Sequence, residues 1–306
     1  MTATLSGSEL AAGIRAEATA AAADLATAGT PPRLAVVVAT ADESSAWYVR
    51  SIARAAQRSG IECSIVDLGE TATPDGIRAE LIRLSADRSV HGIILQTPLP
   101  PQAVVEDLAA SIDPAKDVDG ANPQSLGRLA AGLPSFAPAT AEAVVALLDH
   151  HAVPLFGAHA VVVGRSNVVG KPVAHLLLQR DATVTICHSR TKDLAAVTRS
   201  ADVLIAAVGR PELLTAEHVA DDAVVIDVGT NPAPDGGLIG DVDAASVTGH
   251  AAALTPVPGG VGPVTTALLL RHTVQAALDL AEPTATDGKH AHEHTTRGLP
   301  LTVIEF

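Results

Sequence analysis

The segment AVVVGRSNVVGKPVAHLLL, residues 160–178, has the pattern of a buried strand, a glycine-containing turn and a helix. Its first four residues are apolar without a break, as in a parallel strand covered on both faces. The turn has the spacing Gly164-x-Ser166-x-x-x-Gly170 and includes Arg165. Such glycines let the backbone approach a pyrophosphate, and the helix N-terminus supplies free amides and a positive dipole end. The segment predicts a nucleotide-binding turn.

The residues that follow support this interpretation over the alternative, in which the glycines serve only tight packing. Three more apolar runs have the length of short buried strands, at 182–188, 202–209 and 223–229. Helical or turn-like segments separate them, and this alternation is typical of a parallel sheet that binds a dinucleotide. We therefore predict a Rossmann-like NADP-binding domain at 139–270.

The end of the run 182–188 indicates which dinucleotide is bound. NAD-selective sheets carry Asp or Glu there for the ribose hydroxyls, whereas here the chain continues with HSRTK (188–192). Two cations and two hydroxyls suit the 2′-phosphate of NADP, because the guanidinium is a planar fork of donors. A solvated loop is the alternative. We assign Ser189 and Arg190, together with Arg165, to the cofactor.

The first half of the chain alternates in the same way. Apolar runs at 33–40, 61–68 and 91–96 predict buried strands, and the helices expected around them are 8–28, 44–59 and 76–87. Such βαβ units imply parallel pairing. A stretch rich in Gly, Pro, Asn and Ser, 120–140, reads as the connection between lobes, and further helices are expected at 141–151 and 263–281.

The predicted fold class is therefore α/β with two domains and a ligand cleft between them. The N-terminal catalytic lobe is placed at 1–138 plus 271–285. The last residues, 286–306, are polar, contain His290, His292 and His294, and are expected to form a disordered tail. Histidines at such spacing could bind a metal, but we predict none.

Composition excludes several classes of function. The formal charge of −14 argues against a nucleic-acid or anionic-membrane partner. Cys63 and Cys187 have no metal-ligand spacing and form no disulfide framework. The chain lacks a signal-peptide pattern and an apolar run of membrane-spanning length. These features predict a cytoplasmic protein with no membrane association.

Seven segments together resemble the methylenetetrahydrofolate dehydrogenase/methenyltetrahydrofolate cyclohydrolase family. The resemblance runs in order from about residue 5 to 280, and its most specific motifs are KDVDG (116–120) and TPVPGGVGP (255–263). The other segments are SSAWYVRSIARAAQRSGI (44–61), ILQTPLP (94–100), GRSNVVGKP (164–172), CHSRT (187–191) and IDVG (226–229).

This resemblance implies a folate cleft between the lobes, usually a homodimer, and oxidation of 5,10-methylene- to 5,10-methenyltetrahydrofolate by NADP. Tyr48 would stack on the folate ring system, Gln96 would hydrogen-bond in the cleft, and Asp119 would accept hydrogen bonds from the pterin amidine face. These three are the candidate catalytic residues. The cleft wall between folate and nicotinamide would be formed by Pro258, Gly259, Gly260 and Val261. Thr230, which follows IDVG, would contact the cofactor.

The sequence departs from the family at one position that bears on chemistry. The family motif places a lysine four residues after the tyrosine, whereas here Tyr48 is followed at that distance by Ile52. Residues i and i+4 share a helix face, so Ile52 is expected in the same cleft. The chain has no lysine before Lys116, so a nearby shift of register cannot restore the amine. Milder departures at Thr40 and Ala139 leave an altered folate-like substrate open.

We expect the loss of lysine to affect the two family reactions differently. Hydride transfer needs alignment of two ligands and no obligatory protein base. Hydrolysis needs a group that moves protons, which typically contributes about 10²–10⁴-fold. The sequence thus predicts a dehydrogenase with weak or absent cyclohydrolase activity. Alternatives are a full bifunctional enzyme, a non-catalytic folate- or NADP-binding paralogue, and, more distantly, a shikimate-type dehydrogenase.

Overall fold

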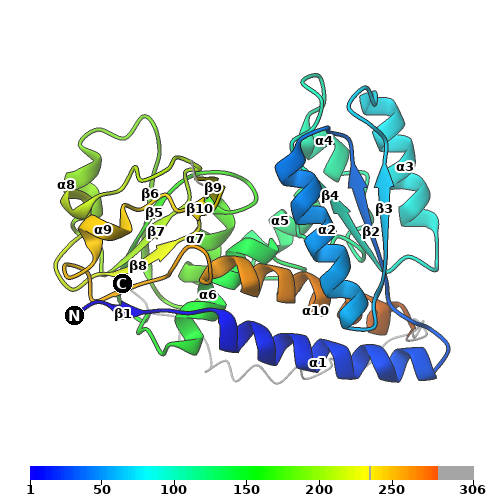
Figure 1. The fold of residues 1–306 in the computed structure, drawn as a ribbon, viewed down its shortest axis with the longest axis horizontal. Helices are drawn as coiled ribbons and strands as arrows, with labels where there is room; N and C mark the ends of the chain where they lie inside the picture. The colour runs from blue at the N-terminus through cyan, green and yellow to red at the C-terminus, as the bar shows by residue number, and fades with distance from the viewer. Residues whose placement is uncertain (234–235, 282–306) are drawn as a thin grey trace.

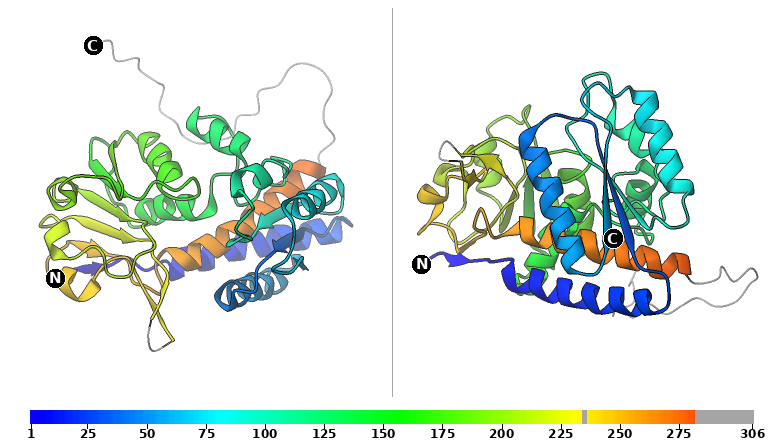
Figure 2. Two further views of the ribbon diagram at one scale, coloured as in Figure 1. Left: turned by 90° about the horizontal axis from the view of Figure 1, so that it is seen from above. Right: turned by 45° about the vertical axis from the view of Figure 1, so that its right-hand side comes forward.

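The computed structural model describes residues 1–233 and 236–281, which form two lobes joined by long helices (Figure 1). The lobe that carries β5 to β8 lies at one end of the molecule, and the lobe that carries β2 to β4 lies at the other. Helices α1 (Ser8–Thr27) and α10 (Val261–Ala281) run side by side beneath the second lobe (Figure 2). Within the described residues, no helix is both long and apolar enough to span a membrane.

The larger sheet is parallel and has the strand order β1-β11-β8-β7-β5-β6. Its strands are β1 (Ala3–Thr4), β5 (His159–Val163), β6 (Thr183–Cys187), β7 (Val203–Ala206), β8 (Val224–Asp227) and β11 (Ala253–Leu254). The four strands predicted in this lobe are confirmed. The apolar residues of β5, β7 and β8 are almost all buried, as expected for strands with neighbours on both sides.

Short elements connect these strands. They are α7 (Gly170–Leu178), α8 (Leu194–Thr198), the 3-10 helix η1 (Ala216–His218), β9 (Asn231–Pro232), β10 (Leu238–Ile239) and α9 (Ala244–Val247). β5 leads through the glycine turn into α7, which is the strand–turn–helix order that the sequence predicts.

The smaller sheet is also parallel, with the order β3-β2-β4. Its elements are β2 (Arg33–Val38), α2 (Glu43–Arg58), β3 (Glu62–Asp67), α3 (Pro74–Ala86), β4 (Gly92–Leu95) and α4 (Val105–Ala109). All three predicted strands are confirmed. β2 is the central strand, and this explains why its side chains after Arg33 are buried while those of the edge strand β3 are half or fully exposed.

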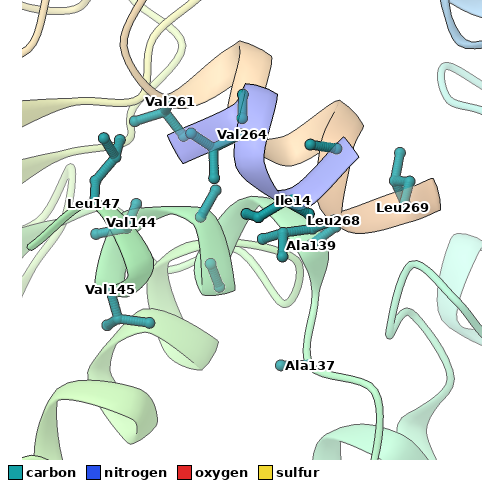
Figure 3. Packing of buried hydrophobic residues seen from close by; sticks show 14 of the residues in the cluster. Ile14, Ala137, Ala139, Val144, Val145, Leu147, Val261, Val264, Leu268 and Leu269 are labelled. Atoms are coloured by element: carbon teal, nitrogen blue, oxygen red, sulfur yellow. The ribbon is translucent and has the colours of Figure 1, made fainter. Parts of the chain in front are cut away.

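A core of three helices joins the lobes. Ile14 of α1, Leu268 of α10 and Ala139 of α6 (Ala139–His150) lie together in this core (Figure 3). Ile14, Leu268 and Ala139 are at most 5% exposed. Because α6 and α10 pack on each other and on elements of the two lobes, the lobes share one apolar core.

Three features differ from the sequence prediction. β1 pairs with β11, so the first residues belong to the larger sheet and not to the N-terminal lobe. The predicted irregular connection contains a helix, α5 (Pro123–Ala130), which Asn122 caps and Pro123 begins. The domain boundary placed at residue 271 falls inside α10, which is one continuous helix. The predicted tail, 286–306, lies outside the described residues.

Candidate active site

The glycine turn after β5 is closely packed against the neighbouring strands. The backbone N–H of Gly164 donates to the carbonyl of Cys187 at the end of β6, at 2.9 Å. A Cβ on Gly164 would lie 2.2 Å from the carbonyl oxygen of Ala207, and φ is +142° there. A Cβ on Gly170 would lie 2.2 Å from the carbonyl oxygen of Gly164. Glycine is therefore required at both positions, and Arg165 is left exposed beside the turn.

The basic segment after β6 lies at the same edge of the sheet. Ser189, Arg190 and Lys192 are exposed there. The loop itself is fixed, because the Thr191 hydroxyl accepts from the His188 N–H at 2.9 Å. The segment thus presents two cations beside the glycine turn.

The first carboxylate after β6, Asp193, is occupied by a structural role. Its side chain accepts from the Ala196 N–H and so caps the N-terminus of α8. In NAD-selective sheets, the acidic residue accepts hydrogen bonds from the ribose hydroxyls. Asp193 instead accepts a hydrogen bond from a helix N-terminus.

A pair of buried carboxylates behind this edge was not predicted. Asp241 accepts from the backbone N–H groups of Val208, Gly209 and Arg210, at 2.6 to 2.9 Å. Asp227, at the end of β8, accepts from the N–H of Asp241 at 2.9 Å. Burial raises the pKa of Asp227 to about 6. The pair fixes the loop after β7.

Thr230 is the third residue after β8, close in sequence to Asp227, and its side chain is exposed. The backbone N–H of Gly229 donates to Asp227 at 2.9 Å, so the chain leading to Thr230 is held by the same carboxylate. Gly240 leaves room for this carboxylate, since a Cβ there would lie 1.8 Å from Asp227 Oδ2. An aspartate that ends an apolar run, followed later by Gly-Asp, is the only sequence signal of this arrangement.

Within the KDVDG motif, each charged residue has a different role. Lys116 is buried, and its Nζ donates to the carbonyls of Ser85 and Asp87 at 2.7 Å each. Asp117 is fully buried and accepts from the backbone N–H groups of Ala121 and Asn122. These two residues therefore shape and anchor the turn.

Asp119 is the carboxylate of the motif that remains available to a ligand. It is half-buried, and burial, followed by the charge of Asp117, raises its pKa to about 7. The charge of His272 and the backbone N–H of Ala139, at the start of α6, act in the opposite direction. The charge of Asp119 acts on Tyr48: burial, and then this charge, raise the pKa of the Tyr48 hydroxyl above its ordinary value. The structure therefore brings the two predicted residues together.

Tyr48 and Gln96 are positioned from two elements of the smaller lobe. α2 begins after Asp42, whose carboxylate accepts from the Ser45 N–H at 2.7 Å. The Ser45 hydroxyl donates to the carbonyl of Thr97 at 3.2 Å, and Gln96 Nε2 donates to the same carbonyl at 2.6 Å. The first turn of α2 is thereby joined to the end of β4.

A cavity of about 390 Å³ opens at this end of the smaller sheet. It is lined by residues that follow β2, β3 and β4, among them Thr40, Asp42, Glu70, Thr71, Leu99 and Pro100. Thr40, one of the departures from the family pattern, thus lies on the wall of a hollow and not in the core.

Ile52 lies one turn after Tyr48 on α2, but it does not line an open cleft. Its side chain is 0% exposed and belongs to the main apolar core. Tyr48 packs against the same core and is half-buried. This differs from the expectation that Ile52 contacts substrate directly. Ile52 is part of the apolar core on which Tyr48 packs.

The PGGVG segment is divided between cleft and core. Pro258 is exposed and Gly259, with φ +113°, is half-buried. Gly260 is buried, and Val261 begins α10 with its side chain only 5% exposed. Only the first two residues are therefore accessible to ligands, whereas Gly260 and Val261 support them from the core. Neighbouring Gly7, at the start of α1, donates its N–H to the Gly259 carbonyl at 2.9 Å.

One hydrogen bond crosses directly between the lobes beside the glycine turn. Asn167 Nδ2, in the turn, donates to Glu106 Oε1 of α4 at 2.7 Å. Lys171 Nζ donates to the Asn167 amide oxygen at 2.7 Å and orients it. This contact was not predicted, because a sequence pattern does not show which residues meet across a cleft.

Family comparisons cover both lobes. The catalytic domain of the tetrahydrofolate dehydrogenase/cyclohydrolase family matches residues 5–119, and the NAD(P)-binding domain of the same family matches residues 138–281. The chain belongs to this family. It is therefore a methylenetetrahydrofolate dehydrogenase/cyclohydrolase-type enzyme with a two-domain α/β fold and a dinucleotide-binding lobe, as predicted.

Individual relatives agree with this assignment. The "Bifunctional protein FolD 1" of Saccharopolyspora erythraea is 74% identical over 90% of this chain and 94% of its own length. The protein of the same name from Rhodococcus jostii is 66% identical over 90% of this chain and 93% of its own.

Solved structures of the family share the fold of this chain. The bifunctional FolD of Campylobacter jejuni has a TM-score of 0.87 at 40% identity and covers 91% of this chain and 99% of its own. The Trypanosoma brucei FolD, solved with NADP cofactor and an inhibitor, has a TM-score of 0.86 at 36% identity, with coverages of 91% and 98%. A shikimate 5-dehydrogenase from Thermus thermophilus, at 16% identity, shares the fold alone.

Proposed function

We propose that this enzyme oxidises 5,10-methylenetetrahydrofolate to 5,10-methenyltetrahydrofolate with NADP, and that its cyclohydrolase activity is weak or absent. The single observation that carries the second half of the proposal is Ile52. A fully buried hydrocarbon stands where the family motif has an amine, one helical turn from Tyr48.

Three side chains of the smaller lobe would supply what oxidation requires. Asp119 would accept hydrogen bonds from the pterin amidine face, and Tyr48 beside it would stack on the folate ring system. Gln96 would complete the polar wall. NADP, when bound, supplies the acceptor for the hydride. The task of the protein is then to align two ligands across the cleft and to exclude water, and the apolar core that the two lobes share supports this.

Hydrolysis places a different demand on the same cleft. Water must lose a proton as it attacks, and a ring nitrogen must gain one. The side chain of Ile52 has no titratable group, and α2 has no lysine. We therefore expect hydrolysis to be slower by about 10²–10⁴-fold than with a positioned acid–base group.

The full bifunctional reaction is the second candidate, and two observations favour it. Relatives at 74% and 66% identity are named bifunctional. In addition, Asp119 has a pKa raised to about 7 by burial, which is the range suited to a general acid–base. Against it, Asp119 would already be engaged by the pterin.

Cofactor choice follows from the edge of the larger sheet. Ser189, Arg190 and Arg165 would bind the 2′-phosphate of NADP, since guanidinium groups match phosphate with paired donors. The Asp193 carboxylate caps the N-terminus of α8, so we do not expect it to bind the ribose hydroxyls. NADP is therefore expected over NAD.

Two assays on the purified protein test the proposal. Oxidation is followed as NADPH formation, and hydrolysis as loss of methenyltetrahydrofolate above the rate without enzyme, in a buffer that slows the spontaneous reaction. We expect oxidation without enzymatic hydrolysis. Brisk hydrolysis would establish the bifunctional alternative, and bound ligands without oxidation would establish the non-catalytic paralogue.

The variant Ile52→Lys sharpens this test. Although Ile52 itself is buried, the longer side chain of lysine can extend along Tyr48 and bring its amine to the substrate, so hydrolysis should appear while oxidation persists. Ile52→Met is the matched control, because it supplies a long unbranched side chain without an amine and conserves volume in the core. If Ile52→Lys and Ile52→Met hydrolyse equally, the amine is not the missing element.

We also infer that the protein forms a homodimer. β6 is an edge strand of the larger sheet, and its Ile186 is 41% exposed, which leaves an apolar edge open to a second copy. Light scattering should give twice the chain mass of 30.9 kDa. A monomeric mass at micromolar concentration would contradict this. The cytoplasm remains the predicted location.

A further inference from the structure

A buried charged cluster lies directly behind the loop that carries Asp119. His272 of α10 is 5% exposed, and its ring packs on Phe136 with a centroid distance of 5.1 Å. Its Nε2 lies 3.0 Å from Glu142 Oε2 of α6. Arg271 donates to the other oxygen of Glu142. The cluster joins the two helices.

Both ring nitrogens of His272 face groups that accept hydrogen bonds. Nδ1 lies 2.8 Å from the carbonyl oxygen of Val118, the residue before Asp119. A carbonyl only accepts, so Nδ1 carries a proton. Nε2 faces a carboxylate, which also only accepts while it is ionised. Two donors on one ring make an imidazolium.

The surroundings of Glu142 favour the ionised carboxylate. Burial opposes ionisation, but the charge and hydrogen bond of His272 and then those of Arg271 outweigh it and lower the pKa of Glu142. Arg271 binds the other oxygen of Glu142 and by itself favours the ionised carboxylate, so the proton between Glu142 and His272 is held by the imidazole. Asp117 and Asp119 place further negative charge near this cation.

We propose that His272 is a positioning residue, a buried imidazolium that holds the Asp119 loop through the Val118 carbonyl and favours the charged form of the Asp119 carboxylate that the substrate requires. The inference rests on the proposed binding role of Asp119. It assigns to α10 and α6 a task in folate recognition, although neither His272 nor Glu142 touches the ligand.

Four charged or titratable groups lie around His272 and influence how it acts on Asp119. Glu142 comes from α6 and Arg271 from α10, while Asp117 and Asp119 come from the loop. Asp119 is faced in addition by Tyr48 of α2. Since Asp117 and burial both favour protonation of Asp119, His272 is the cation that opposes them.

The protonation state of His272 can be measured without reference to activity. Histidine-selective ¹⁵N NMR of the wild-type protein under the assay conditions should show one ring in which both nitrogens carry a proton, as the two acceptors around His272 require. The signal is assigned by its loss in His272→Asn or by its shift in Glu142→Gln. A neutral His272 ring in this spectrum would overturn the proposal, whatever the enzyme catalyses.

Kinetics then test the link to Asp119. In the wild type, kcat/KM for methylenetetrahydrofolate should rise with pH around a midpoint near 7, because the carboxylate binds only when ionised. Removal of a neighbouring cation by His272→Asn should raise that midpoint by about one unit. At pH 7 the ionised fraction would fall from about one half to about one tenth, so KM for the folate should increase about fivefold. KM for NADP and kcat at saturation should not change.

His250→Asn is the matched control. His250 also bonds a carboxylate, Asp221, and a carbonyl, that of Val219, but it lies in the larger lobe. Its replacement should leave the midpoint unmoved. If His272→Asn lowers stability or kcat but keeps the midpoint, His272 is merely structural and the proposal fails. If the wild type does not use folate at all, the proposed function fails while the NMR result stands.

Discussion

The two lobes present their ligand-binding groups in different ways. In the larger lobe, the groups at the cofactor edge are largely backbone: the glycine turn, and the loop after β7 that Asp241 holds by three N–H groups. In the smaller lobe they are side chains, chiefly Tyr48, Gln96 and Asp119. A site built from backbone groups keeps its geometry when a side chain is replaced, as long as the residues that hold the loop, such as Asp241, remain. A site made of side chains can lose one reaction by a single replacement, as we propose for Ile52.

The largest effect is expected from the supports of the cofactor edge. Asp241→Ala should remove the acceptor of three partly buried backbone N–H groups and of the buried Asn231 amide, at about 1–3 kcal/mol for each group that water does not reach. We expect a total loss of about 3 kcal/mol or more in the free energy of unfolding, together with loss of NADP binding. Denaturant unfolding and cofactor titration measure the two. Asp243→Ala is the control, because Asp243 caps only the four-residue helix α9. Equal stability of both variants would contradict the role of Asp241.

A smaller and more selective effect is expected in the folate lobe. Asp119→Asn should reduce kcat/KM for methylenetetrahydrofolate by about 10- to 100-fold, since a charged hydrogen bond contributes about 1.5–3 kcal/mol. KM for NADP should hold. The wild-type rise in kcat/KM around pH 7 should also disappear, because burial raises the pKa of Asp119 to about 7 and Asn does not titrate. A variant that keeps the wild-type pH profile would show that another group titrates.

The smallest effect is expected at the exposed cations. Arg190→Ala should raise KM for NADP about tenfold at low salt and leave KM for NAD unchanged, because only NADP carries the 2′-phosphate. The difference should shrink as salt screens the exposed charge. Arg199→Ala is the control, since Arg199 binds the Glu217 carbonyl away from β6. A parallel rise for NAD would indicate that Arg190 serves the loop and not the phosphate.

Features with a backbone cause could be predicted from the sequence, whereas contacts between distant side chains could not. Strands such as β2 and β5 are readable because continuous apolar runs indicate burial on both faces. The glycine turn is readable because its spacing has a backbone cause. β1 is only two residues long and pairs with β11 from the far end of the chain, so local pattern cannot reveal it. The helix α5 was missed because Gly, Pro and Ser dominate its surroundings.

Side chains that meet across elements were the least predictable. His272 lies inside a helix that reads simply as apolar, and its partners Val118 and Glu142 are 154 and 130 residues away. Asp117 and Asp119 look alike in sequence, and only the structure shows that Asp117 is fully buried and accepts from two backbone N–H groups, whereas Asp119 is half-buried and is bonded by the Ala139 N–H alone among backbone donors. Ile52 was correctly placed on the helix face of Tyr48 but is buried beneath the cleft.

The central claim is that the cleft aligns two ligands for hydride transfer but has no amine to move protons for hydrolysis. The most direct measurement is the hydrolysis of methenyltetrahydrofolate by the wild-type enzyme, on a preparation whose NADP-dependent oxidation has been confirmed. We predict a rate indistinguishable from that of buffer, and a clear rate with Ile52→Lys. Enzymatic hydrolysis by the wild type at a rate comparable to its oxidation would contradict it.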